Sequence, residues 1–285
     1  MIQTLFIIAQ IIVPHHLLTR LIGYFGRSRI NWIKTLFIKQ FIRIYQVDLA
    51  EAEIQNPDQF ASFNDFFVRA LKSDARLIAT EPEIITSPAD GSVSQLGHIS
   101  GDRIFQAKHH DFSLRELLGG DDALAHAFHG GSFATIYLAP RDYHRVHMPL
   151  DGELVSMTYV PGRLFSVNQT TTERIERLFA RNERVICHFN TELGPCAVIL
   201  VGAMIVGSID TVWHGQVAPP LRQLRQYQYA QTSSVKLLKG DEMGRFKLGS
   251  TVIVLFPANT ITWNSDLRPE TPVKMGQQIG KLNHY

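Results

Sequence analysis

The first 47 residues contain no acidic side chain, although they carry six of the 28 basic residues of the 285-residue chain. The remainder therefore has 22 basic residues against 26 acidic ones, so the net charge of +2 belongs to the amino-terminal end. This asymmetry indicates that the two ends of the chain meet different surroundings. The hydrophobic content of 45% is enough to bury a large core, which argues against disorder.

Several common functional motifs are also missing. The sequence has no GxGxxG, Walker or HExxH pattern, so nucleotide-binding and zinc-protease functions lack their usual support. The two cysteines, Cys187 and Cys196, lack the CxxC spacing of metal and redox sites, and we expect buried thiols and no metal. A disulfide is the alternative, although nothing indicates an oxidising compartment.

Long apolar runs are absent as well. The run at 5–13 ends at Pro14 and is too short to span a bilayer, which needs about 20 apolar residues. No basic residue precedes it and no small-x-small site follows it, so a signal peptide fits poorly. The 13-residue apolar stretch at 197–209 contains Gly202 and Gly207, and we expect a buried strand pair or a bent strand there.

An amphipathic helix is predicted where apolar side chains recur at helical spacing, at Ile30, Ile33, Phe37, Phe41 and Ile44. Lys39 and Arg43 lie on the opposite face, and Trp32 is nearby. This pattern suits a helix in an anionic headgroup layer, where each cation adds about 1 kcal/mol of attraction. Packing on the protein's own core is the ordinary alternative. Because acids are absent, we expect residues 1–47 to form N-terminal amphipathic membrane-associated helices.

Residues 48–83 have the character of a connector. Asn56-Pro57 marks a turn, and Ser62 is placed to cap a short helix that runs through Phe67 toward Leu71.

From residue 84 onward, short apolar runs bounded by Gly, Pro, Asn and Asp predict the strands of one β-rich domain, 84–285. The runs are 84–86, 93–96, 133–138, 154–160, 185–189, 197–209 and 251–256. Two helical interruptions are expected, at 113–118 and at 172–181. The second is supported by Glu173 and Arg177 at i,i+4 spacing.

A weak internal repeat bears on the fold. Residues 88–93 and 149–154 share the pattern P-x-D-G-x-aliphatic, and residues 273–280 resemble a turn of lipoyl and biotinyl carrier domains and related barrel-sandwich folds. Pro-x-Asp-Gly is also common turn chemistry. The expected fold class is α+β and β-rich, with a barrel-sandwich-like catalytic domain behind the amino-terminal helices.

Three segments carry side chains suited to catalysis: 87–91 (SPADG), 140–149 (PRDYHRVHMP) and 244–251 (GRFKLGST). The tetrapeptide LGST alone is a weak signal, because four small, common residues arise by chance; beside RDYHRVH it is strong. Together the segments resemble the phosphatidylserine decarboxylase family, with its bacterial short form the nearest match. The likeness covers nearly the whole chain.

The resemblance implies a chain that cuts itself between Gly249 and Ser250, giving a β chain of residues 1–249 and an α chain of residues 250–285. Ser250 would become a pyruvoyl group, a covalent pyruvate cofactor. That group would decarboxylate phosphatidylserine to phosphatidylethanolamine through a Schiff base, with no free cofactor.

The resemblance also assigns roles. Asp90, His147 and Ser250 would form the self-processing triad, and His144 would serve the later decarboxylation. A serine hydroxyl is a poor nucleophile near neutral pH, so a neutral imidazole has to remove its proton. A carboxylate on the far ring nitrogen fixes the tautomer. Gly249 crowds the attacked carbonyl least, and an imidazole with a pKa near 6.5 suits reprotonation of the carbon that loses CO2.

The lipid phosphate has two candidate partners in the sequence. Arg141 and Arg145 fit either that role or salt bridges to Asp142 or Glu153.

The expected partners are phosphatidylserine, an anionic membrane surface and the chain's own second fragment, as a heterodimer of α and β chains with further oligomerisation left open. No nucleic acid is expected. The expected location is the cytoplasmic side of the cell membrane, bound peripherally. A serine hydrolase is the leading alternative, but the sequence lacks the G-x-S-x-G elbow. A carrier or membrane-binding module would have no reason to contain the three segments.

Overall fold

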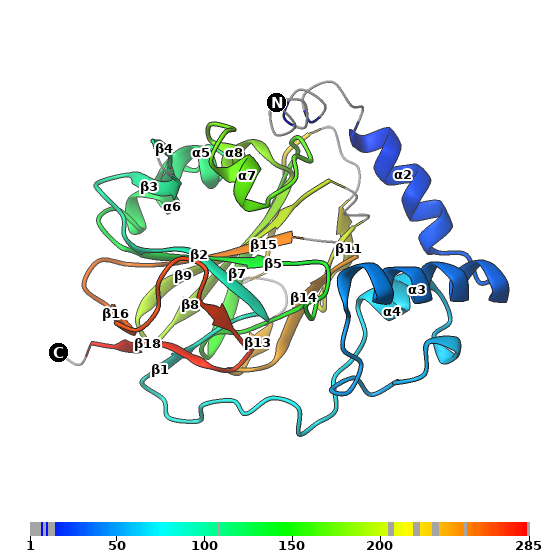
Figure 1. The fold of residues 1–285 in the computed structure, drawn as a ribbon. Helices are drawn as coiled ribbons and strands as arrows, with labels where there is room; N and C mark the ends of the chain where they lie inside the picture. Colours follow the sequence, from blue (N-terminus) through cyan, green and yellow to red (C-terminus); the bar gives the residue numbers. More distant parts are fainter. Residues whose placement is uncertain are drawn as a thin grey trace.

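The computed structural model describes residues 7, 10, 15–107, 109–204, 208–218, 223–229, 234–247 and 250–283. Amino-terminal helices lie at one side of a large body of β-strands, and short helices from the middle of the chain gather at another side (Figure 1). The α+β, β-rich class is therefore confirmed, while the barrel-sandwich arrangement and the division into three regions stay predictions.

The described helices are short apart from two near the amino terminus. They are α2 (His15–Gly26), α3 (Asn31–Tyr45), the 3₁₀ turn η1 (Pro57–Gln59), α4 (Phe63–Phe67), α5 (Leu114–Leu117), α6 (Asp122–Ala127), α7 (Gln169–Thr172) and α8 (Leu178–Arg181). The predicted turn at 56–57 and the predicted cap at Ser62 are both confirmed, since the Ser62 hydroxyl accepts a hydrogen bond from the backbone of Asp65. The capped helix ends before Leu71.

The largest sheet has nine strands. In spatial order they are β12 (Arg225–Gln228), β7 (Gly152–Val160), β8 (Arg184–Thr191), β9 (Gly194–Gly202), β15 (Ser250–Phe256), β5 (Ser132–Leu138), β2 (Gly91–His98) and β17 (Pro272–Val273), while β13 (Lys236–Leu237) also pairs with β7. The neighbouring strands are antiparallel. Strand β15 therefore lies in the interior of the sheet.

Three smaller sheets complete the β-structure of the described residues. One has the order β11 (Gly215–Ala218), β10 (Ile209–Thr211), β14 (Glu242–Phe246) and β6 (Arg145–His147); another has β1 (Ile84–Thr86), β18 (Gln278–Leu282) and β16 (Ile261–Trp263); and β3 (Arg103–Ala107) pairs with β4 (His110–Ser113). Each run predicted as a strand contains one. The stretch 197–209 holds the end of β9 and the start of β10, which belong to different sheets.

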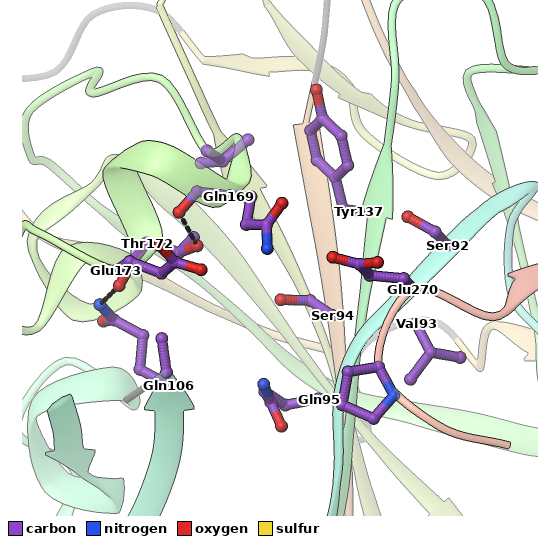
Figure 2. A pocket seen from close by; sticks show the side chains of 13 residues that line it. Ser92, Val93, Ser94, Gln95, Gln106, Tyr137, Gln169, Thr172, Glu173 and Glu270 are labelled. Atoms are coloured by element: carbon purple, nitrogen blue, oxygen red, sulfur yellow. Dashed lines mark hydrogen bonds between the residues drawn. The ribbon is translucent and has the colours of Figure 1, made fainter. Parts of the chain in front are cut away.

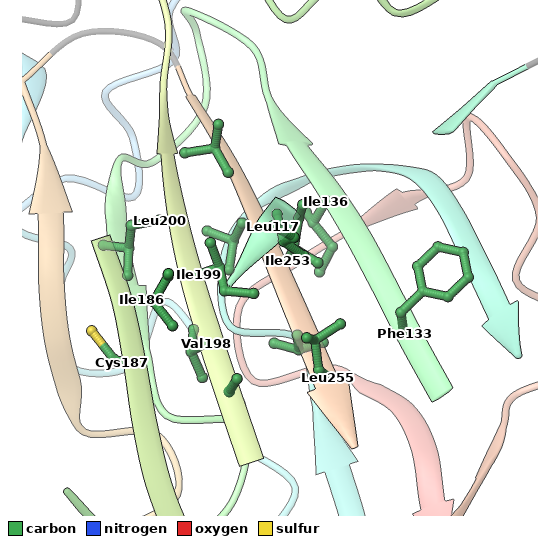
Figure 3. Packing of buried hydrophobic residues seen from close by; sticks show 14 of the residues in the cluster. Leu117, Phe133, Ile136, Ile186, Cys187, Val198, Ile199, Leu200, Ile253 and Leu255 are labelled. Atoms are coloured by element: carbon green, nitrogen blue, oxygen red, sulfur yellow. The ribbon is translucent and has the colours of Figure 1, made fainter. Parts of the chain in front are cut away.

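The main core lies along the centre of the nine-stranded sheet (Figure 3). All seven residues of β15 are buried, and its Ile253 is opposite Ile199 of β9. Each aliphatic side chain buried in this way stabilises the fold by about 1.5–3 kcal/mol. Cys187 and Cys196 are free and buried, which confirms the prediction of thiols, and burial raises the pKa of both.

A second, smaller core joins α3 to α4. Phe41 of α3 makes edge-to-face contacts with Phe66 and Phe67 of α4. Lys34 of α3 is buried, and its ammonium donates to the backbone carbonyls of Asp58 at 2.8 Å and Phe60 at 2.5 Å. The carbonyls compensate for burial of the charge, so α3 is fixed to the connector partly through a cation.

Large apolar side chains of α2 and α3 are left exposed. They are Tyr24, Phe25, Trp32, Leu36, Phe37, Ile44 and Tyr45. In the connector, Ile54 and Leu77 are exposed as well. Packing on the protein's own core thus accounts for only part of the predicted stripe. Within the described residues, every helix is too short or too polar to cross a bilayer. The run at 5–13 lies almost entirely outside the described residues.

The single helix predicted at 172–181 is wrong. Two short helices, α7 and α8, stand there instead, and Arg177 between them has a positive φ of 53°. Arg177 pairs with Glu116 rather than with Glu173. The buried side chain of Gln106 binds the carbonyls of Thr172 and Ile175, so the backbone groups of the break are satisfied by a residue far away in sequence.

Candidate active site

Backbone hydrogen bonds bring the three segments singled out in the sequence together. The amide of His147 donates to the carbonyl of Pro88 at 2.8 Å, which joins segment 140–149 to segment 87–91. The amide of Phe246 donates to the carbonyl of His144 at 3.0 Å, which joins the same segment to 244–251. Segment 140–149 is therefore the centre of the site.

Ser250 is the first residue of β15, where the chain passes from the four-stranded sheet into the nine-stranded one. It is paired with Leu138 of β5 and Gly202 of β9, and it is fully buried. Its hydroxyl has no hydrogen-bond partner among the described residues. A buried hydroxyl without a partner is costly and usually has a functional reason. Gly249, on the other side of the expected cut, lies outside the described residues.

His144 is linked to Ser250 through the end of β5: its Nε2 donates to the carbonyl of Ala139 at 3.0 Å, and Ala139 follows Leu138, the strand partner of Ser250. The ring is fully buried and stacked on Phe67, with ring centroids 4.1 Å apart. Burial lowers the pKa of His144 to about 3. The ring is therefore neutral, and its Nδ1 is a lone-pair acceptor without a hydrogen-bond partner among the described residues.

His147 is buried at the end of β6, with both ring nitrogens occupied. Its Nδ1 donates to the carbonyl of Gly240 at 2.8 Å, so its Nε2 accepts from the hydroxyl of Tyr143 at 3.0 Å. Burial lowers the pKa of His147 and raises the pKa of Tyr143, so the imidazole is neutral and the phenol keeps its proton. The neutral tautomer has the acceptor that a general base needs.

Asp90 has other partners than the expected histidine. Its carboxylate accepts from Nε of Arg76 at 3.0 Å, from Nη2 of Arg76 at a shorter distance, and from the backbone amide of Met275 at 2.8 Å. Asp90 is near enough to His147 for its charge to favour the protonated ring.

The side chains of the expected triad are thus brought into one region but are not hydrogen-bonded to one another. Among the described residues, no hydrogen bond joins Asp90 to His147 or either histidine to Ser250. The roles assigned from the resemblance stay predictions. In the described geometry, a backbone carbonyl fixes the His147 tautomer, which is the function expected of Asp90.

Sequence reasoning missed three groups that hold the site. Tyr143 lies inside the quoted segment 140–149, so its hydroxyl was a visible candidate. Arg76, the partner of Asp90, lies in the connector among residues with no motif, and the Gly240 carbonyl is a backbone group that no sequence pattern reveals.

The ion pairs expected of the nearby arginines differ from those found. Arg145 pairs with Glu242 at 2.8 Å and donates to the carbonyl of Val68 at 2.9 Å, so it forms a salt bridge, but with a different acid from those considered. Arg141 is exposed and makes no ion pair with another described residue.

A cavity of about 350 Å³ lies beside the nine-stranded sheet, on the face opposite to the one that the Ser250 side chain points to. Its lining residues include Ser92, Tyr137, Gln169, Glu173 and Glu270 (Figure 2). Tyr137 is paired with Thr251, and successive side chains on a strand point to opposite faces. The Ser250 side chain therefore points away from this cavity.

Known proteins resemble this chain over almost its full length. A family model described as phosphatidylserine decarboxylase matches residues 63–281, and a second model, described as PSD, matches residues 5–46. A phosphatidylserine decarboxylase proenzyme of Saccharophagus degradans is 59% identical over 278 residues, which is 98% of this chain and 97% of the relative. Proteins of the same name are 56% identical over 280 residues in Pseudomonas fluorescens (98% and 97% of the two chains) and 58% identical over 275 residues in Pseudomonas aeruginosa (96% and 95%).

These matches define the class first: the chain is an enzyme, a decarboxylase whose relatives are proenzymes. It belongs to the phosphatidylserine decarboxylase family, which confirms the resemblance found in its sequence.

Proposed function

We propose that the chain cuts itself between Gly249 and Ser250 and uses the resulting pyruvoyl group to convert phosphatidylserine to phosphatidylethanolamine. The observation that carries this proposal is the buried, unpaired hydroxyl of Ser250, close to His144 with its unpaired Nδ1. Two buried polar atoms without partners at one strand end fit a site whose chemistry consumes the hydroxyl. The proenzyme names of the relatives support the same conclusion.

Self-cleavage would begin when the Ser250 oxygen attacks the carbonyl carbon of Gly249 and a neutral imidazole, that of His147, takes the hydroxyl proton. Collapse of this adduct breaks the peptide C–N bond and leaves an ester. Removal of the α-proton of residue 250 then expels the Gly249 carboxylate and gives dehydroalanine, and water replaces its nitrogen, which leaves as ammonia. Because Nε2 of His147 is occupied by Tyr143, that hydroxyl has to give way first.

The pyruvoyl group supplies a carbonyl for the substrate amine and an electron sink for the pair released with CO2. The chain's contribution is then a proton, for which we propose His144. Burial holds its ring neutral in the uncut chain. Negative charge that develops on the substrate carbon as CO2 leaves would raise the pKa of His144, which favours the protonated ring that an acid requires.

The two fragments would remain together after the cut. Fragment 250–285 contributes β15, which is paired along its length with β5 and β9 of the larger fragment, and its side chains are buried in the main core. This supports a stable heterodimer of α and β chains.

Residues 1–47 would hold the enzyme peripherally on the anionic, cytoplasmic face of the cell membrane. The support is the exposed apolar side chains of α2 and α3, together with the exposed basic residues Arg27, Arg29 and Arg43 and a sequence without an acid before Asp48. An exposed apolar patch rimmed by basic side chains is typical of interfacial helices.

Mass spectrometry of the purified protein tests the proposal directly. We expect fragments of 249 and 36 residues, the smaller with a blocked amino terminus, and borohydride in the presence of phosphatidylserine should attach the lipid to the smaller fragment. An intact 285-residue chain with full activity would disprove the mechanism. A serine hydrolase would need no stoichiometric cut.

A further inference from the structure

A polar cavity of about 190 Å³ adjoins the candidate active site, between the connector and segment 140–149. Its lining residues include Arg69, Arg76, Asp90, Arg141, Asp142 and Tyr143. Tyr143 and Asp90 link this cavity to the site, since Tyr143 binds His147 directly.

Arg69 is the buried cation of this cavity, and the residue is only 5% exposed. Its Nη2 donates to the carbonyls of Arg141 at 2.9 Å and Asp142 at 3.3 Å. Its Nε and Nη1 have no hydrogen-bond partner among the described residues. A buried guanidinium with unused donors is costly unless an anion receives them.

The acids that line the cavity are occupied by other donors. Asp90 and Glu51 both pair with Arg76, and Glu51 also pairs with Lys274. Asp142 accepts from the backbone amide of Ala139, and Asp48 from that of Ala50.

None of these carboxylates accepts a hydrogen bond from Arg69 in the described structure. The charges of Asp90 and Asp142 favour its protonation, but burial outweighs them and lowers the pKa of Arg69. The cavity therefore has a free cationic position although its formal charges balance.

We propose that Arg69, with Arg141 at the rim, binds the phosphodiester of the phosphatidylserine headgroup. This inference rests on the proposed function. The alternative anion is the substrate carboxylate, but an ion pair would stabilise the group that has to leave as neutral CO2, which raises the barrier. The phosphodiester keeps its charge throughout the reaction, so its binding positions the substrate without that penalty.

The surroundings fit a lipid that enters from α3. A second cavity, lined by Ile44, Tyr45, Ala139 and Pro140, shares Gln46 and Arg141 with the first. Its Ile44 and Tyr45 belong to the exposed apolar face of α3. A bound lipid would place its acyl chains at that face, its phosphate at Arg69 and its amine toward His144. Arg69 is near enough to His144 for its charge to help lower the pKa of the ring.

The test is isothermal titration calorimetry on the Ser250→Ala chain, which stays uncut and keeps this cavity. Glycerophosphoethanolamine should bind, whereas ethanolamine, without the phosphodiester, should not. Arg69→Gln should weaken the binding by about 10-fold or more, the usual scale for a charge-assisted hydrogen bond. Lys72→Gln is the matched control, because Lys72 is an exposed cation three residues away that does not line the cavity, and it should bind as the parent does.

Unchanged affinity in Arg69→Gln, or no binding by the parent, would overturn the inference. If inorganic phosphate binds as tightly as glycerophosphoethanolamine, the site does not recognise the lipid headgroup, and that part of the inference is wrong. If Arg69→Gln shows no cooperative melting transition, the Arg141→Gln variant is measured instead, because this exposed side chain makes no hydrogen bond or ion pair with another described residue. Weaker binding by that variant supports the site, and equal binding contradicts it. Release of CO2 from phosphatidylserine by the wild-type enzyme is measured separately, so a failure of the proposed function is seen independently of the calorimetry.

Discussion

The amino-terminal helices and the β-rich region depart in different ways from the usual placement of side chains, since the helices expose large apolar groups and the β-rich region buries unpaired polar atoms. In α2 and α3, Tyr24, Trp32 and Ile44 are 73%, 71% and 68% exposed, while the ammonium of Lys34 is buried against carbonyls. At the start of β15 and directly before β6, by contrast, the polar residues Ser250 and His144 are buried beside the apolar core.

Both the exposed apolar side chains and the buried unpaired polar atoms lower the stability of the folded chain in water when no membrane or substrate is bound. Exposed aromatic side chains forgo the hydrophobic contribution of about 1.5–3 kcal/mol each, and buried polar atoms without partners lose hydrogen bonds to water. The difference fits the two tasks proposed above, in which the helices bind a membrane surface and the β-rich region carries out the decarboxylation away from water.

The two histidines provide the test with the largest expected effect. His147→Ala should leave an uncut chain with no decarboxylase activity, as should Ser250→Ala, because neither generates the electrophile. His144→Ala should be cut largely as the parent is, yet turn over phosphatidylserine about 100-fold more slowly or worse, the scale of general acid catalysis. Gel electrophoresis and CO2 release measure the two steps.

Ser132→Ala is the control, since Ser132 is a buried serine at the other end of β5, and it should be cut and active. If His144→Ala accumulates uncut while His147→Ala is cut, the two roles are reversed. In that outcome the base would be Nδ1 of His144, which has no hydrogen-bond partner among the described residues.

The exposed face of α3 can be tested without deleting a helix. Trp32→Ser with Phe37→Ser should weaken binding to anionic vesicles by about 30-fold, because two large apolar side chains no longer enter the interface. Vesicle sedimentation at moderate salt measures the change. Leu238→Ser removes an exposed leucine of the β-rich region and should bind as the parent does. Equal loss in both variants would place the membrane contact elsewhere.

Asp90→Asn should slow self-cleavage by about 10-fold rather than abolish it. The carboxylate lies near His147 and stabilises the imidazolium that forms as Ser250 is deprotonated. The structure adds a second route, because the same change removes the ion pair with Arg76. A time course of fragment formation gives the rate of self-cleavage. The Arg76→Gln variant separates the effect of the charge near His147 from that of the ion pair. If Arg76→Gln slows self-cleavage as much as Asp90→Asn does, Asp90 acts through the ion pair.

The smallest expected effect is on stability against pH. The folded-state pKa of His144 is about 3, below its ordinary value of 6.5, so below pH 6.5 the unfolded chain binds a proton that the folded chain does not. Stability is therefore complete above pH 6.5 and falls as the pH drops toward 3. In a Ser250→Ala background, the melting temperature should fall with pH by about 3 °C per unit more than in the same chain with His144→Ala. Parallel curves would contradict this.

The sequence was most informative where a short pattern decides a local structure. Apolar runs bounded by turn residues located the strands, because alternation and β-branched composition act over a few neighbours. The helix at 172–181 was misplaced because the i,i+4 pair of Glu173 and Arg177 competes with Glu116 and Gln106, which only the fold brings near.

By itself, then, the sequence determined the family, the strand-forming runs, the charge asymmetry and the side chains available for catalysis, since each of these lies in composition or in a contiguous segment. The tertiary structure decided which side chains meet. In the fold, Asp90 pairs with Arg76, a backbone carbonyl binds His147, and two buried donors of Arg69 are left without a partner among the described residues beside a cavity. Contacts of this kind join residues far apart in the chain, and burial, which sets their energies, exists only once the chain has folded.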